Sequence, residues 1–211
     1  MPTPIAEVPY FSQWESAAMT PEVLRDGKAA LRRDPLWRAS GAGSVEEYAR
    51  WADQVCGMAC LKMILAHRTS HRWPVLELAR GCAEYGGYVE EADGTIRGLI
   101  YAPFTRFVRE RFGIEARVVT EVTAADLPTI LREADFFVAS VHPAIRWPEA
   151  EPPGRGGHLV LVTEATAEGV VFHNPSGHDR AAQEAVRLPL EVFGGFFAGR
   201  GVATYFEEHP C

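Results

Sequence analysis

The chain has 211 residues, of which 47% are hydrophobic and 23% charged, and a globular chain of this length can bury a core without disulfide cross-links. Acidic residues outnumber basic ones by 28 to 21, giving a formal net charge of −7, so a nucleic-acid partner is not expected. No apolar stretch approaches the roughly 18 residues of a membrane-spanning helix, and the first residues lack the basic start and apolar run of a signal peptide. The sequence therefore predicts a cytoplasmic protein with no membrane partner, and it does not indicate an oligomeric state.

The cysteines and histidines do not predict a cross-linked or metal-binding protein. Four cysteines, at positions 56, 60, 82 and 211, do not form a disulfide framework for a chain of this length, which indicates a reducing compartment. Cys56 and Cys60 lie near His67 and His71, but none of the usual zinc-ligand spacings is present. We therefore expect no metal site, and no cofactor either.

The first fifty residues predict an extended start followed by irregular structure. Pro9 biases the residue before it away from helix, so residues 8–13 are expected to be extended. Residues 14–43 are irregular, with a candidate helix after Thr20-Pro21, because proline is well tolerated at the first helical position. The capping-box pattern Ser44-Val45-Glu46-Glu47 predicts a helix that runs to about residue 52.

The helix that begins near Cys56 is the most informative element of the first half. Apolar residues at helical spacing predict one buried stripe on it, made by Cys60, Leu61, Ile64 and Leu65. Two further helices are predicted at residues 74–84 and 102–112, each followed by a glycine that can end it.

Strands dominate the second half. Segments rich in β-branched and aromatic residues predict strands at residues 114–120, 136–141, 158–164, 170–173 and 202–206, with a helix at residues 123–133 between the first two. Helices followed mostly by strands predict an α+β protein with two lobes around a cleft.

Cys56 is the first candidate for chemistry. A thiol is nucleophilic as its thiolate, and unpaired N–H groups at a helix start lower a thiol pKa by favouring negative charge. Cys56 is predicted at such a helix start, next to Gly57, whereas Cys60 falls on the buried stripe and is expected to be inert. The alternative is that both are small core residues, since free cysteine is among the most buried residue types.

His158 and Asn174 favour the chemical interpretation. His158 opens one predicted strand, Asn174 follows the next, and Glu168-Gly169 predicts the turn between them. Folding this hairpin about its middle brings His158 opposite Asn174 or a near neighbour, with both side chains on the same face. An amide beside an imidazole can hold the ring in the tautomer that a general base requires.

Three patches of the sequence, in order, resemble one family. Residues 56–65, Cys-Gly-Met-Ala-Cys-Leu-Lys-Met-Ile-Leu, resemble the cysteine segment of the bacteriocin-processing C39 peptidases. Residues 8–13, Val-Pro-Tyr-Phe-Ser-Gln, resemble the opening of stand-alone C39-like proteins, and Gly157-His158 followed by Asn174-Pro175 resembles the Gly-His and Asp-Pro of the family. The resemblance implies a papain-like fold, in which a helical lobe carrying the cysteine helix packs against an antiparallel sheet carrying His158 and Asn174.

The sequence departs from the family pattern in two places. Asn174 stands where the family usually has Asp, which is still the choice made in papain-type enzymes. The oxyanion-hole glutamine of the family lies shortly before the cysteine, whereas Gln13 is separated from Cys56 by a long segment. Gln54 is closer to Cys56, but its separation of two residues is shorter than the separation found in the family. We predict Gln13 in this role and treat residues 14–50 as an insertion near the cleft, within a single domain of residues 1–211.

The leading hypothesis is a cysteine peptidase-like hydrolase that cleaves a peptide or other amide through an acyl-enzyme. The catalytic residues would be Cys56, His158, Asn174 and Gln13, and the residues that bind the substrate are not indicated. One alternative passes the same acyl group to an amine, as an acyltransferase or peptide cyclase does. A second alternative is a peptide-binding module without catalysis.

Overall fold

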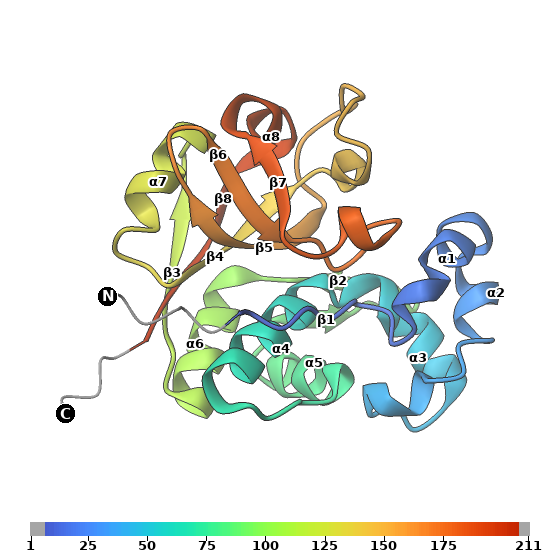
Figure 1. Cartoon of the computed structure of the whole chain (residues 1–211). Coiled ribbons are helices and arrows are strands. Elements are labelled where there is room, and N and C mark those ends of the chain that lie inside the picture. The colour runs from blue at the N-terminus through green and yellow to red at the C-terminus, as the bar shows by residue number, and fades with distance from the viewer. Residues whose placement is uncertain (1–6, 207–211) are drawn as a thin grey trace.

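The computed structural model describes residues 7–206. Most of its helices come from the first half of the chain and most of its strands from the second half, and they form two lobes (Figure 1). The α-helices are α1 (Thr20–Asp26), α2 (Lys28–Leu31), α3 (Val45–Trp51), α4 (Cys56–Thr69), α5 (Val75–Glu84), α6 (Tyr101–Phe112), α7 (Leu127–Ile130) and α8 (Leu190–Phe196). The strands are β1 (Tyr88–Glu90), β2 (Ile96–Gly98), β3 (Glu115–Thr120), β4 (Phe136–Val141), β5 (His158–Ala165), β6 (Gly169–His173), β7 (Val186–Pro189) and β8 (Phe197–Tyr205). Cys211 lies outside the described residues.

A six-stranded antiparallel sheet forms one lobe, in the order β3-β8-β4-β5-β6-β7. The helices α4, α5 and α6 and the β1-β2 hairpin form the other lobe (Figure 1). Side chains alternate between the two faces of the sheet: Val138, Leu159 and Leu161 pack into one core with α4–α6, and Val160 and Val162 into a second core with α8. The predicted α+β class, with the cysteine helix packed against the sheet, is confirmed.

The helix α4 is buried on all sides, whereas the sequence predicted a single buried stripe. All residues from Gly57 to Ala66 are buried, including Lys62. This burial follows from the position of α4, which packs against α5 and against β4 and β5 of the sheet. Among residues 7–206, no helix is long and apolar enough to cross a bilayer.

Two predicted elements of the second half have other bounds in the structure, and β7 and α8 were not predicted. The helix predicted at residues 123–133 is instead a short 3₁₀ turn followed by α7, because Pro128 has no N–H to continue a helix begun at residue 124. The last strand, β8, begins at Phe197 rather than residue 202, and the two glycines within it, at positions 199 and 201, conceal its strand character in the sequence.

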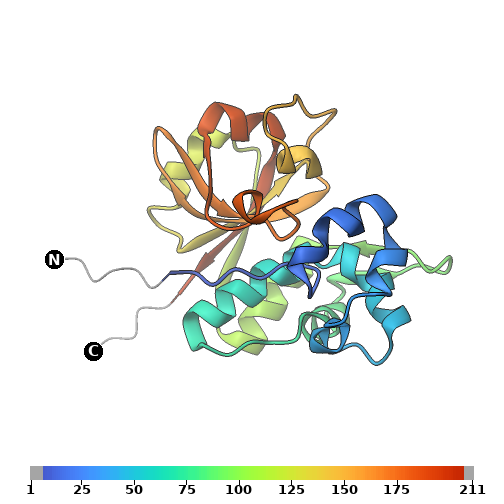
Figure 2. The ribbon, with the colours of Figure 1, turned by 45° about the vertical axis from the view of Figure 1, so that its right-hand side comes forward.

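Residues 14–51 build a small helical cluster with its own core. This core contains Trp14, Val23, Leu31, Tyr48 and Ala49, and the predicted cap of α3 is present, with the Ser44 side chain accepting from the N–H of Glu47. In Figures 1 and 2 the helices α1–α3 lie at one end of the helical lobe.

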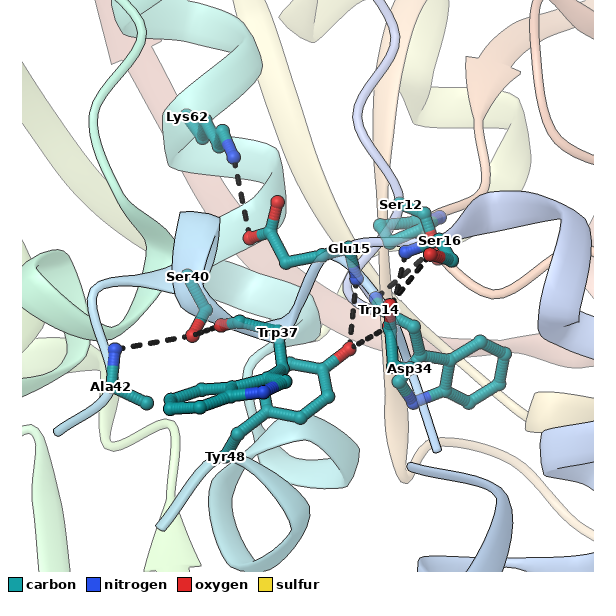
Figure 3. Close-up of polar contacts among 11 residues, drawn as sticks. Ser12, Trp14, Glu15, Ser16, Asp34, Trp37, Ser40, Ala42, Tyr48 and Lys62 are labelled. Carbon is teal, nitrogen blue, oxygen red and sulfur yellow. Dashed lines mark hydrogen bonds and ion pairs between the residues drawn. The ribbon is translucent and has the colours of Figure 1, made fainter. Parts of the chain in front are cut away.

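Asp34 holds this cluster together from its interior (Figure 3). Its carboxylate is 2% exposed and accepts hydrogen bonds from the Tyr48 hydroxyl at 2.6 Å and from the Ser16 hydroxyl and N–H at 2.6 and 3.1 Å. Glu15, beside Ser16, forms a buried ion pair with Lys62 of α4 at 3.5 Å. The cluster is thereby attached to the helix that carries Cys56.

We predict that Asp34→Ala lowers the free energy of unfolding by about 2–4 kcal/mol, because it leaves the buried Tyr48 hydroxyl and Ser16 N–H without an acceptor. Urea denaturation followed by circular dichroism measures this change. The matched control is Glu46→Ala, which removes a carboxylate that is 67% exposed in its ion pair with Arg32 and is expected to cost little. Equal effects of the two substitutions would contradict this role for Asp34.

Candidate active site

The first turn of α4 lies against the start of β5. Cys56 is the first residue of α4, and the Cys60 thiol, one turn later, approaches the Leu159 carbonyl at 3.9 Å. A Cβ on Gly57 would come within 2.8 Å of the Leu99 side chain and 2.9 Å of the Leu159 side chain. A larger residue at position 57 would have to displace these two side chains, so Gly57 lets them pack directly against the start of α4, beside the strand that carries His158.

Cys56 and His158 line one cleft of about 420 Å³ between the two lobes. Its other walls come from residues 98–101, Ser140, Gly157, Leu159 and Arg200, of which only Gly157 belongs to a motif predicted from the sequence. No hydrogen bond joins the Cys56 thiol to the His158 ring among the contacts of the described residues. A larger hollow of about 580 Å³ contains Arg155 and Glu191 and shares Arg200 with this cleft, but it has neither a cysteine nor a histidine.

The β5-β6 hairpin brings His158 and Asn174 together, as the sequence predicted. Val162 pairs with Phe172 and Leu161 with His173, with an irregularity between Val162 and Glu164. The strict register therefore does not place Asn174 directly opposite His158. The two side chains nevertheless meet, with His158 Nε2 lying 2.9 Å from Asn174 Oδ1. Asn174 is fully buried and His158 is 5% exposed.

Hydrogen bonds fix the orientation of the Asn174 amide and the tautomer of His158. The backbone N–H of Ser176 donates to Asn174 Oδ1 at 3.1 Å, so the oxygen and not the amino group must occupy that position. Because Oδ1 only accepts, His158 Nε2 must carry a proton to bond with it. In the neutral ring, Nδ1 is then the free base.

The N-terminal segment, residues 7–13, holds the Asn174 loop in place. In Figures 1 and 2 it runs along the boundary between the two lobes. The Tyr10 hydroxyl donates to the Asn174 carbonyl at 3.1 Å, the Ser12 hydroxyl to the Pro175 carbonyl at 3.0 Å, and the Gln13 N–H to the same carbonyl at 2.9 Å. The Val-Pro-Tyr-Phe-Ser-Gln segment therefore fixes the position of the loop that carries Asn174.

Gln13 lies between the Asn174 loop and the turn that precedes α4. Its Nε2 donates to the Ala52 carbonyl at 3.2 Å, which leaves one Nε2 hydrogen available, and its Oε1 is buried without a partner among the described residues. Gln13 is not one of the residues that line the 420 Å³ cleft. Gln54 is half-buried in the 3₁₀ turn Ala52–Gln54 and does not line it either.

The electrostatics of Cys56 differ from the prediction of a lowered thiol pKa. Burial raises the pKa of the Cys56 thiol above its usual value, although the N–H groups of Leu159, Gly57 and Cys56 itself and the charge of Arg146 act in the opposite direction. Burial also lowers the pKa of His158 to about 3, with a further contribution from Arg146, while the hydrogen bond to Asn174 opposes the shift. Both shifts favour the neutral forms of the thiol and the imidazole.

Arg146 and Ser176 belong to this site and were not identified from the sequence. Arg146 ends the 3₁₀ helix η5 (Pro143–Arg146), and its guanidinium donates to the Ser176 hydroxyl and carbonyl. Ser176 could have been found, because Asn-Pro-Ser is a sequence in which an Asn side chain accepts from the N–H two residues later. Arg146 carries no such signal, since 30 residues separate it from Ser176.

The cysteines and histidines considered as a metal site do not gather at the cleft. Cys60 faces β5, His67 packs edge-on against Phe136, and His71 packs against Trp73. His173 is held between the Val8 carbonyl and the Ala185 N–H, so its position is structural.

Comparison with known proteins defines the class of fold. A solved structure of the peptidase domain of Streptococcus ComA, described as a bifunctional ABC transporter involved in a quorum-sensing pathway, aligns with 72% of this chain and 91% of that domain, with 14% identity and a TM-score of 0.50. The chain therefore shares the α+β fold of that peptidase domain.

A second solved structure is a double-glycine-motif protease from an AMS/PCAT transporter, in complex with its leader peptide. It aligns with 71% of this chain and 82% of that one, with 17% identity and a TM-score of 0.46. No protein-family model matches the chain, and no curated protein sequence does.

We predict a plateau in the rate at which iodoacetamide alkylates Cys56 between about pH 5 and pH 8, because neutral His158 can accept the thiol proton as sulfur attacks. His158 remains neutral throughout this range, since its pKa of about 3 lies below it. In His158→Ala the rate should instead rise steadily with pH, as the thiolate alone reacts. Peptide mass spectrometry on the folded protein measures both profiles, and a steadily rising profile in the unsubstituted protein would contradict the prediction.

Proposed function

We propose that this protein is a cysteine hydrolase that cleaves a peptide or other amide bond through Cys56, His158 and Asn174. The observation that carries the proposal is the bond of 2.9 Å between His158 Nε2 and Asn174 Oδ1, made beside a cleft that His158 shares with Cys56 at the start of α4. The fold shared with a cysteine peptidase domain supports the same conclusion.

The reaction begins from the neutral pair. Nδ1 of His158 takes the thiol proton as Cys56 Sγ attacks the carbonyl carbon, so the thiolate forms only as it is consumed. The imidazolium then donates this proton to the leaving amine, and the C–N bond breaks to give a thioester. Water, deprotonated by the same nitrogen, attacks the thioester; the C–S bond then breaks, the acid is released, and the imidazolium returns its proton to Cys56 Sγ.

The oxyanion of the tetrahedral intermediate requires hydrogen-bond donors near Cys56. The backbone N–H of Cys56 at the start of α4 and the remaining hydrogen of Gln13 Nε2 are the proposed donors. Asn174 would keep the imidazole oriented while its charge changes. Residues 14–50 would then form an insertion that flanks this side of the domain.

The direct test is incubation of the purified chain with a mixture of synthetic peptides, followed by mass spectrometry. Cleavage products should appear with the unsubstituted protein and be absent with Cys56→Ala and His158→Ala, both checked for folding by circular dichroism. The same incubation with an added amine distinguishes hydrolysis from acyl transfer, because an acyltransferase would give products that carry the amine. Undiminished cleavage by Cys56→Ala would overturn the proposal.

The two glutamines can be separated on any substrate found in this way. We predict that Gln13→Ala lowers kcat about 100-fold or more, the usual effect of removing one oxyanion donor, with little change in KM. Gln54→Ala is the matched control and should leave kcat nearly unchanged. The opposite order of the two effects would assign the oxyanion donor to Gln54.

A further inference from the structure

A buried serine lies beside the imidazole, on the side that Asn174 occupies. Ser176 is fully buried, and its Oγ is 3.0 Å from His158 Nε2, the same nitrogen that lies 2.9 Å from Asn174 Oδ1. Two oxygens from one short loop therefore face one ring nitrogen.

Arg146 determines how the Ser176 hydroxyl can bond. Its Nη2 and Nε donate to Ser176 Oγ at 2.7 and 3.1 Å, and Nε also donates to the Ser176 carbonyl at 2.7 Å. A guanidinium can only donate, so Ser176 Oγ acts as an acceptor towards Arg146. Its own hydrogen can point to Asn174 Oδ1, which is 3.4 Å away.

The positions of Ser176 Oγ and Asn174 Oδ1 fit a His158 ring that carries a hydrogen on Nε2. If Ser176 donated to Nε2, that nitrogen would carry no hydrogen, and it would face Asn174 Oδ1 as one acceptor against another. With the hydrogen on Nε2, both oxygens accept it, and every polar contact in the group joins a donor to an acceptor. Nδ1 is then left without a hydrogen.

The charges around the ring agree with this assignment. Arg146 forms no ion pair with a carboxylate among residues 7–206. It is the charged group that acts on His158, while Asp53 and Cys56 act on Arg146 itself. A cation held behind the imidazole disfavours a second proton on the ring.

We propose that Ser176, held by Arg146, is a positioning residue that shares the Nε2 proton of His158 with Asn174 and so preserves the basic Nδ1 tautomer. The inference rests on the proposed function of His158 as a base. In this inference Asn174 supplies only part of the orientation of the His158 ring. Arg146 gains a role at the site that the family resemblance does not imply.

The test combines histidine NMR with Cys56 labelling in four proteins: unsubstituted, Ser176→Ala, Asn174→Ala and the double variant. Long-range proton–nitrogen spectra report which ring nitrogen of His158 is protonated, independently of any activity. Each single variant retains one acceptor, so each should keep the Nε2-protonated ring and lose about two- to tenfold in labelling rate at neutral pH. The double variant should give a mixture of tautomers and lose more than the product of the two single effects, approaching His158→Ala.

Two further variants keep the test decisive if a double variant folds poorly. Arg146→Met leaves Ser176 in place but removes its donors and the nearby charge, and should shift the pH profile of labelling as His158 becomes easier to protonate. Thr163→Val is the matched control, because it removes a hydroxyl of the same hairpin that donates to the Val171 carbonyl at 3.3 Å and does not contact His158.

The outcomes separate the inference from the function on which it rests. If Cys56 labelling depends on His158 but neither Ser176→Ala nor Arg146→Met changes the rate, tautomer or pH profile, the inference is wrong and the proposed function stands. A multiplicative double variant would also overturn the sharing of one proton. If labelling does not depend on His158 at all, the proposed function fails first.

Discussion

The close contact between the first turn of α4 and the start of β5 is the constraint on which the rest of the site depends. Gly57 has no Cβ and so allows the Leu159 and Leu99 side chains to lie against the helix. This contact places the first residue of a buried helix and the first residue of a central strand on the same cleft. The helical lobe, the sheet and the N-terminal segment between them then fix the side chains on either side of that contact.

Burial decides the electrostatic character of the site. The helix start and the charge of Arg146 both favour a thiolate at Cys56, but removal of water disfavours every charged form and outweighs them. The same effect keeps His158 neutral. A neutral pair is consistent with a mechanism in which proton transfer accompanies attack, and it requires the imidazole to be held in one tautomer. The hydrogen bonds that Asn174 and Ser176 accept from His158 Nε2, and that Arg146 donates to Ser176, supply this restraint.

Local patterns in the sequence predicted the elements that position the site. The cysteine helix, the β5-β6 hairpin with its turn, and the meeting of His158 with Asn174 all follow from helical spacing, strand alternation and turn residues. Contacts between distant segments could not be predicted in this way. The register irregularity near Thr163, the Arg146–Ser176 bonds and the burial that raises the Cys56 pKa depend on the packed structure. The position of Gln13 as an oxyanion donor stays a prediction.

A crystal structure of the protein with a peptide aldehyde tests the central claim most directly. The account predicts a covalent bond between Cys56 Sγ and the aldehyde carbon, with the resulting oxygen near the N–H of Cys56 and with His158 Nε2 still bonded to Asn174. An aldehyde bound away from Cys56, or a His158 ring turned away from Asn174 in the complex, would contradict it.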